Sequence, residues 1–332
     1  MTIRLKPLDE QVIVITGASS GIGLATARMA ADKGARLVLA ARNDVALQDL
    51  VDEIRDKGGQ ATHVAVDVAS EEDVRRIAEE AVAAFGGFDT WVNNAGVSVY
   101  GRTHEAPIDD LRRMFETNFW GVVYGSRIAS QHLRENGGAI INIGSELSDV
   151  AAPLQGMYSA SKHAVKGWTD AMRMELQDED APIAVTLIKP AAIDTPYADH
   201  AGNEMADHPR HVPPVYSPAA VAEAILHAAT TPTRDLFVGC AGMVVSTLNK
   251  MMPGVMDRIV RRVLIPGTHS GDPKHSRDAL YQAGDGGQER GHYPGLVRPS
   301  FYTKAKMNPM VTGAAVLGAG AVALAVRRSR RD

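Results

Sequence analysis

Apolar and polar residues follow two alternating patterns over the first 240 residues of the chain. Short apolar runs rich in β-branched residues lie at 11–16, 36–41, 62–67, 90–94, 139–144, 183–188 and 235–239. The segments between them have helical spacing. In residues 70–85, for example, the apolar stripe consists of Val74, Ile77, Ala78, Ala81 and Val82. Strands that alternate with helices predict a parallel sheet covered on both faces, so we expect a doubly wound α/β domain over residues 1–240.

The pattern loosens after residue 190. Residues 195–217 hold four prolines and three histidines, which predicts a loop or a short flap at the edge of the substrate pocket. Residues 241–305 form a helical and irregular extension, with an amphipathic helix predicted at 250–264. Residues 266–298 contain few apolar side chains and predict a linker or a disordered stretch.

The C-terminal segment 306–332 is apolar and ends in arginines. Its uncharged run 308–326 has almost the length that spans a bilayer, but many of its residues are alanine and glycine. Two interpretations stay open, membrane contact with the Arg-rich end on the cytoplasmic side and an Ala-rich helix docked on the protein surface.

Composition narrows the classes of function. The chain has 332 residues and a net charge of −4, which argues against a nucleic-acid-binding protein. Its one cysteine, Cys240, excludes an intrachain disulfide and favours a reducing compartment. The first residues lack the apolar core of a signal peptide, and the histidines follow no metal-binding motif. We therefore expect a cytoplasmic protein that acts on a small molecule without a metal.

A glycine-rich turn follows the first predicted strand and opens into a predicted helix. In the sequence TGASSGIG (16–23), Gly17, Gly21 and Gly23 permit a tight turn and a close approach to a pyrophosphate at the positive end of that helix. The expected cofactor contacts of this turn are Gly17, Ser19, Ser20, Gly21, Ile22 and Gly23. Glycine also serves turns without ligands, so the position between strand and helix carries the prediction.

The end of the second strand bears on the choice of cofactor. NAD-binding sheets usually place an acidic residue there, whereas this chain has Ala41 followed by Arg42. An arginine can neutralise a 2′-phosphate, so we expect NADP, with NAD as the alternative if Arg42 is only a solvated surface residue.

The motifs taken together resemble those of the classical short-chain dehydrogenase/reductase family. The resemblance rests on TGASSGIG, NNAG (93–96), Asn118 in ETNFWG, Ser145 and YSASK (158–162), and it covers about residues 9–240. It implies a seven-stranded Rossmann sheet, a nicotinamide cofactor and interconversion of an alcohol and a ketone or aldehyde. It also implies a homodimer or homotetramer formed through helices at about 108–134 and 156–178.

The resemblance assigns roles to further residues. Asp67 and Val68 would flank the adenine, and Asn94, Ala95 and Gly96 would line the ribose side. The family's stretch near the nicotinamide matches Pro190, Ile193 and Thr195, and it departs at Ala191, where the family usually has glycine.

Four residues would carry the chemistry. On a helix Tyr158 and Lys162 project from one face, and a neighbouring ammonium favours the phenolate. Tyr158 would act as general acid or base, and Lys162 would also hold the nicotinamide ribose. Ser145 would bind the substrate oxygen, and Asn118 would hold a water linked to Lys162.

Several alternatives accompany this hypothesis. Tyr197, the segment 211–216 and the methionines near residue 252 suggest an apolar substrate, although methionines at such spacing also occur in ordinary cores. Glu146 is expected as a solvated turn residue, with a place in the substrate pocket as the other option. A non-catalytic dinucleotide sensor and a membrane-tethered scaffold are the competing functions.

Overall fold

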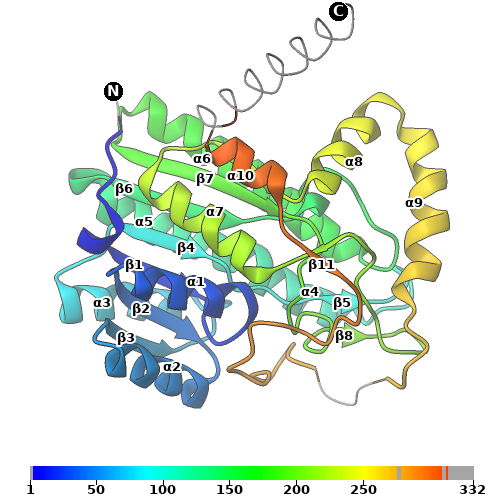
Figure 1. Cartoon of the computed structure of the whole chain (residues 1–332), viewed down its shortest axis with the longest axis horizontal. Helices are drawn as coiled ribbons and strands as arrows, with labels where there is room; N and C mark the ends of the chain where they lie inside the picture. The colour runs from blue at the N-terminus through cyan, green and yellow to red at the C-terminus, as the bar shows by residue number, and fades with distance from the viewer. Residues whose placement is uncertain (1–2, 275–277, 309–311, 313–332) are drawn as a thin grey trace, which may run out of the picture.

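The computed structural model describes residues 3–274, 278–308 and 312, and its centre is a seven-stranded parallel sheet (Figure 1). The strand order is β10-β7-β6-β4-β1-β2-β3, and all of these neighbours pair in parallel. The strands are β1 (Val12–Thr16), β2 (Arg36–Ala41), β3 (Gln60–Ala65), β4 (Thr90–Asn93), β6 (Gly138–Ile143), β7 (Ile183–Pro190) and β10 (Asp235–Val238). The predicted doubly wound fold and its seven strands are confirmed.

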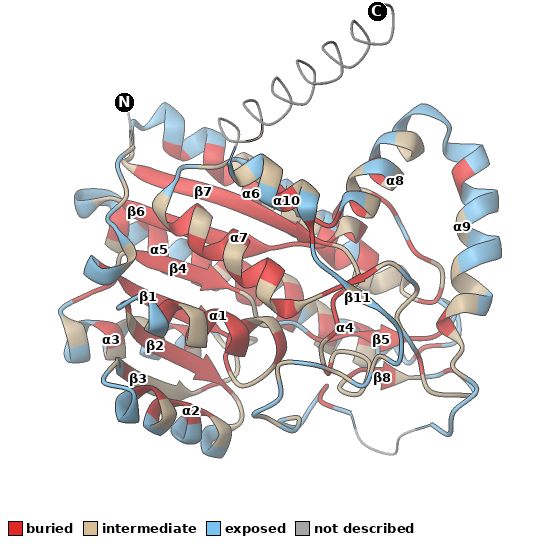
Figure 2. Cartoon of the chain, viewed as in Figure 1, coloured by how far each residue is buried: buried red, intermediate tan, exposed pale blue. Residues whose placement is uncertain are grey.

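Helices cover both faces of the sheet, as Figure 2 shows by the buried strands between them. One face packs against α1 (Gly21–Asp32), α2 (Asp44–Asp56) and α7 (Pro218–Thr230), and the other against α3 (Glu71–Phe85), α5 (Gly121–Asn136) and α6 (Gly156–Asp178). In α3, Ser70 caps the first turn, and Val74, Ile77 and Ala81 of the predicted apolar stripe are buried, whereas Val82 is 50% exposed.

The chain reverses its direction across the sheet between β1 and β4. Strands β2 and β3 follow on one side of β1, whereas β4, β6, β7 and β10 follow on the other. Loops after β1 and β4 therefore diverge and leave a crevice at their carboxyl ends, where open α/β sheets bind ligands. The Asn94 side chain links the two loops because its Nδ2 donates to Thr16 O at 2.9 Å.

Some predicted boundaries differ from the observed ones. The third strand was expected at 62–67 and is β3, two residues earlier. The helix expected at 108–134 consists of α4 (Ile108–Phe115), a π-helical turn η2 (Glu116–Trp120) and α5. The helix expected at 156–178 is α6, with the same bounds.

Short elements complete the described chain. These are the 3-10 helices η1 (Leu8–Glu10) and η3 (Glu146–Ser148), the short strands β5 (Val99–Tyr100), β8 (Gly202–Asn203), β9 (Val215–Tyr216) and β11 (Val297–Arg298), and the helices α8 (Cys240–Met251), α9 (Pro253–Thr268) and α10 (Phe301–Met307). The amphipathic helix predicted near 250–264 corresponds mainly to α9.

Two expectations for the C-terminal part have different outcomes. Residues 278–291 are not a free linker, because Leu280 is 1% exposed and packs in a core cluster with Val97, Leu111 and Met114. The predicted apolar run 308–326 lies outside the described residues apart from Asn308 and Thr312. Within the described ranges, no helix combines the length and the apolar character needed to cross a bilayer.

Candidate active site

The glycine-rich turn between β1 and α1 has the close backbone packing that its sequence predicts. Gly17 has φ +67°, and a side chain there would lie 2.8 Å from Ala95 Cα. At Gly23 an added Cβ would lie 2.1 Å from Gly17 O, so this position tolerates glycine alone. Gly23 packs the first turn of α1 against the loop, which brings the positive end of the helix to the crevice.

A cavity of about 310 Å³ runs along the crevice from this turn to α6. Of the residues assigned to the cofactor, those that line it are Gly17, Ser19, Ser20, Gly21, Ile22, Arg42, Asp67, Val68, Asn94, Ala95, Gly96, Tyr158, Lys162, Pro190, Ile193 and Thr195. Gly23 lies behind the lining. One continuous cavity joins a helix N-terminus with two loops of small residues, which fits an extended dinucleotide.

Three of the four predicted catalytic residues meet in the same cavity. Tyr158 and Lys162 lie one turn apart on α6, and the Lys162 ammonium is 5.6 Å from the Tyr158 ring centroid. Ser145 lies two residues after the end of β6 and caps η3, where its hydroxyl accepts a bond from Leu147 N, and its hydrogen bond to the Tyr158 side chain lowers the pKa of that phenol. Lys162 is 4% exposed and donates to Ile143 O at 2.9 Å, which fixes its position.

Asn118 lies in the π-helical turn η2, behind the cavity rather than in its lining. Its side-chain amide makes two hydrogen bonds to the backbone of Val97. Asn118 Oδ1 accepts from Val97 N at 2.8 Å, and Asn118 Nδ2 donates to Val97 O at 2.9 Å. A side chain at Gly96 would lie 3.3 Å from Asn118 Oδ1 and 3.9 Å from Lys162 Nζ. Asn118 therefore holds the loop after β4 next to Lys162, and π-helical turns often occur at functional sites.

Burial dominates the electrostatics of the catalytic pair. It raises the pKa of Tyr158 to about 12, although hydrogen bonds from Tyr197 and Ser145 lower it in part. Burial also lowers the pKa of Lys162 to about 8. The expected lowering of the Tyr158 pKa by Lys162 is thus outweighed in the protein chain alone, and Tyr158 is a protonated phenol at neutral pH.

Arg42 has partners that the sequence did not predict. Its guanidinium donates to Ala279 O and, at 3.1 Å, to Leu280 O. Arg113 ion-pairs with Asp67 and also donates to Leu280 O at 3.1 Å. Two guanidinium groups thus lie near each other beside Asp67, at one end of the cavity, and both contact a segment of the C-terminal extension.

The substrate side of the cavity contains polar groups that sequence reasoning placed elsewhere or missed. Glu146 lines the cavity, and burial raises its pKa to about 7, so the expectation of a solvated turn residue is wrong. His211 also lines it, and its buried Nε2 has no hydrogen-bond partner within the part of the chain that the structure describes. The His211 ring stacks on Tyr197 at 6.0 Å between centroids. In the sequence, Tyr197 and the apolar residues of segment 211–216 had indicated this region, and the pocket was the alternative place for Glu146.

Comparisons with known proteins agree with this geometry. Residues 11–206 match the family model described as short chain dehydrogenase. The uncharacterized oxidoreductase YxnA of Bacillus subtilis is 49% identical over 98% of this chain and 93% of its own length. The 11-beta-hydroxysteroid dehydrogenase A of Arachis hypogaea is 41% identical over 56% of this chain, which spans about half (53%) of that protein.

A solved structure supports the same conclusion. A short-chain dehydrogenase/reductase from Burkholderia phymatum in complex with NAD superposes with a TM-score of 0.69 and 27% identity, over 76% of this chain and 96% of its own. The matched family model, the near full-length relative and the shared fold establish that this chain is an oxidoreductase of the short-chain dehydrogenase family.

Proposed function

We propose that the chain is an NADP(H)-dependent oxidoreductase that interconverts a secondary alcohol and a ketone or aldehyde. The observation that carries the proposal is the meeting of Tyr158, Lys162 and Ser145 on one wall of the cavity that the glycine-rich turn opens. The bound nicotinamide would supply or accept the hydride. The protein would bind and orient the substrate oxygen and move one proton.

Tyr158 is suited to donate that proton during carbonyl reduction. Its raised pKa, about 12, keeps the phenol protonated at neutral pH, which is the form that a general acid needs. Ser145 would hydrogen-bond the carbonyl oxygen as negative charge develops on it. Lys162 would hold the nicotinamide ribose, and Asn118 would position the backbone of the β4 loop and a water beside Lys162.

The cofactor assignment rests on charge at the adenine end. Arg42 directly follows β2, where many NAD-binding sheets have a carboxylate, and Arg113 lies near it. Asp67 pairs with Arg113, whereas Arg42 donates to the neutral carbonyls of Ala279 and Leu280, so its charge would be available to a 2′-phosphate. The Burkholderia relative was solved with NAD, so cofactor choice needs a direct measurement.

An apolar substrate body with a polar group fits the other end of the cavity. Its lining there includes Tyr100, Leu147, Val212 and Leu264. The peanut relative, which is named for a hydroxysteroid, makes a polycyclic or similar apolar alcohol the first class to assay.

The test combines cofactor titration with one catalytic variant. NADPH and NADH fluorescence titrations of the purified chain should show tighter NADPH binding, and Arg42→Ala should reduce that preference at least tenfold. Tyr158→Phe should bind cofactor normally and lose about 10²–10⁴ in kcat for a ketone substrate. Unchanged turnover in Tyr158→Phe would contradict the assigned mechanism.

We also propose that the chain forms a homodimer or homotetramer through α4, α5 and α6. Ile108 of α4, Met174 of α6 and Trp120, which ends η2 directly before α5, are large apolar residues that are exposed in the single chain. Analytical ultracentrifugation of Ile108→Asp together with Met174→Asp should show a smaller species than the unchanged protein.

A further inference from the structure

The segment 278–291, called the strap below, contributes residues to the lining of the cofactor cleft. In Figure 1 it lies beside α1 instead of leading away from the domain. Its polar, glycine-rich sequence resembles a linker, but Leu280 is buried among Val97, Val99 and Met114. Ala279 N donates to His200 O at 2.8 Å, which ties the strap to the substrate loop. One end of the strap is therefore anchored in the core beside the catalytic site.

The strap bonds the same residues that form the cofactor site. The strap carbonyls of Ala279 and Leu280 accept hydrogen bonds from Arg42, and the Gly284 carbonyl accepts from Asn43 Nδ2 at 2.9 Å. Gly21 N donates to Gln288 O, and Gly287 N donates to Ser19 O, both at 2.9 Å. The backbone of the glycine-rich turn and the end of β2 thus hold the strap in place.

The strap forms a wall of the cavity and does not fill it. Its residues in the lining are Ala279, Ala283, Gly284 and Asp285. On the other side the same cavity is lined by residues such as Gly17, Asp67 and Val68. Space for a ligand is thus enclosed between the nucleotide-binding loops and the strap.

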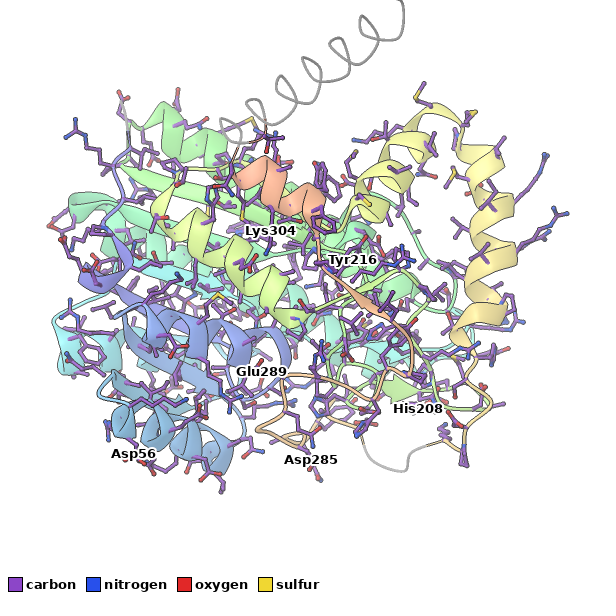
Figure 3. The ribbon with its side chains drawn as sticks, viewed as in Figure 1. Asp56, His208, Tyr216, Asp285, Glu289 and Lys304 are labelled. Atoms are coloured by element: carbon purple, nitrogen blue, oxygen red, sulfur yellow. The ribbon has the colours of Figure 1, made fainter. Side chains whose placement is uncertain are left out.

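Two side-chain contacts also attach the strap to helices on either side of the cleft, α1 and α4. Glu289 pairs with Arg28 of α1 at 2.8 Å, and the Tyr281 hydroxyl donates to Asp110 of α4 at 2.8 Å. Figure 3 labels Asp285 and Glu289 on the strap, close to the helices of the nucleotide-binding half. These two anchors lie outside the cavity, so each can be removed without changing a residue that lines it.

We propose that the strap is a clamp that closes over the adenosine half of the bound dinucleotide and must open for the cofactor to enter or leave. This inference rests on the proposed function, namely that the cleft binds a nicotinamide dinucleotide. The clamp holds the cofactor because a ligand enclosed between two walls contacts both, and its release requires the strap bonds to break first.

The experiment compares cofactor release in the full chain and in a variant with both anchors removed, Glu289→Gln with Tyr281→Phe. Stopped-flow fluorescence measures the dissociation of NADPH, or of NADH if that binds better, after excess oxidised cofactor is added. We expect release at least tenfold faster and a correspondingly higher Kd. The matched control is Glu179→Gln, which removes an exposed ion pair with Arg134 remote from the cavity, and it should release cofactor like the unchanged protein.

Each other outcome overturns the clamp. Tighter binding in the anchor variant would show that the strap competes with the cofactor, and unchanged release would show that it is a fixed surface element. Hydrogen–deuterium exchange adds a readout independent of activity, because cofactor should slow exchange in peptides covering 278–291. If the unchanged protein binds neither NADPH nor NADH, the proposed function itself fails, whereas normal binding with unaltered release removes the clamp alone.

Discussion

The Tyr197 ring lies edge-on to the Tyr158 ring, with centroids 5.5 Å apart and planes at 68°. The two side chains hydrogen-bond, and this bond lowers the otherwise raised pKa of Tyr158. The Tyr197 hydroxyl also accepts from Gln155 Nε2 at 2.9 Å. Because the Tyr197 hydroxyl accepts from Gln155, its own proton is free to point toward Tyr158, and this bond stabilises the phenolate form of Tyr158, the proposed general base.

Tyr197→Phe should therefore shift the pH dependence of alcohol oxidation. Without the donated bond, the pKa of Tyr158 rises further, so kcat at neutral pH falls about three- to tenfold and recovers at higher pH. Carbonyl reduction, which uses the protonated phenol, should change less. The measurement is a pH profile of kcat in both directions.

Tyr100→Phe is the matched control for that profile. Tyr100 is buried and contacts the Tyr197 ring edge-on at 6.1 Å, whereas the hydrogen bonds that lower the pKa of Tyr158 come from Tyr197 and Ser145. Its profile should stay close to that of the unchanged protein. Equal shifts in the two variants would indicate altered packing and not a lost hydrogen bond.

Glu146 should make the folded protein less stable as the pH rises. Burial raises its pKa from 4.5 to about 7, so the folded state retains a proton that the unfolded chain releases. The contribution to stability is fully present below pH 4.5 and is lost as the pH rises through 7. A glutamine carries no charge at either pH, so Glu146→Gln should raise the free energy of unfolding, relative to the unchanged protein, by about 3 kcal/mol more at pH 8 than at pH 4.

Thermal melts at the two pH values check this expectation. Glu71→Gln, on the exposed face of α3, is the control, because Glu71 makes only a surface ion pair with Arg75. A gain that is the same at pH 4 and pH 8 would contradict the titration of Glu146.

The glycine-rich turn offers a sharper test of backbone packing. Gly23→Ala should abolish cofactor binding and lower stability by several kcal/mol, since its Cβ would lie 2.1 Å from Gly17 O. Gly167→Ala, on α6 with no atom near the added Cβ, should instead stabilise the protein by about 0.5–1 kcal/mol. Urea denaturation and cofactor titration of both variants distinguish the two effects.

The sequence predicted the sheet, and it predicted that Ser145, Tyr158 and Lys162 lie together, because both features depend on local patterns. Each of these patterns is contained in a short stretch of sequence. Examples are the continuous apolar strands, the turn at Gly17 and the spacing of Tyr158 and Lys162. The strap escaped prediction because its main contacts use backbone carbonyls, as at Ala279 and Gly284, which any sequence supplies. Leu280 is a large apolar residue within this polar stretch, and the structure buries it.

Glu146 was misjudged for a related reason. Its position after a strand suggests a turn, but α8 packs over that turn, and a side chain at Gly242 would lie 2.9 Å from Glu146 Oε2. The element that buries the carboxyl group comes almost a hundred residues later in the chain, so no local pattern announces it.

The last prediction concerns a buried ion pair near the substrate side of the sheet. Lys189 and Asp149 lie 2.9 Å apart, with side chains 7% and 4% exposed, and the Lys189 ammonium is 4.0 Å from the Phe237 ring centroid. Asp149→Leu should cost about 3–5 kcal/mol, because it leaves a buried ammonium without its counter-ion. Adding Lys189→Met to that variant should restore most of the loss, since the charge that was left unpaired is then gone. Urea denaturation of the two single variants and the double variant gives the interaction energy from a double-mutant cycle. Additive losses would show that water or another group already compensates Lys189.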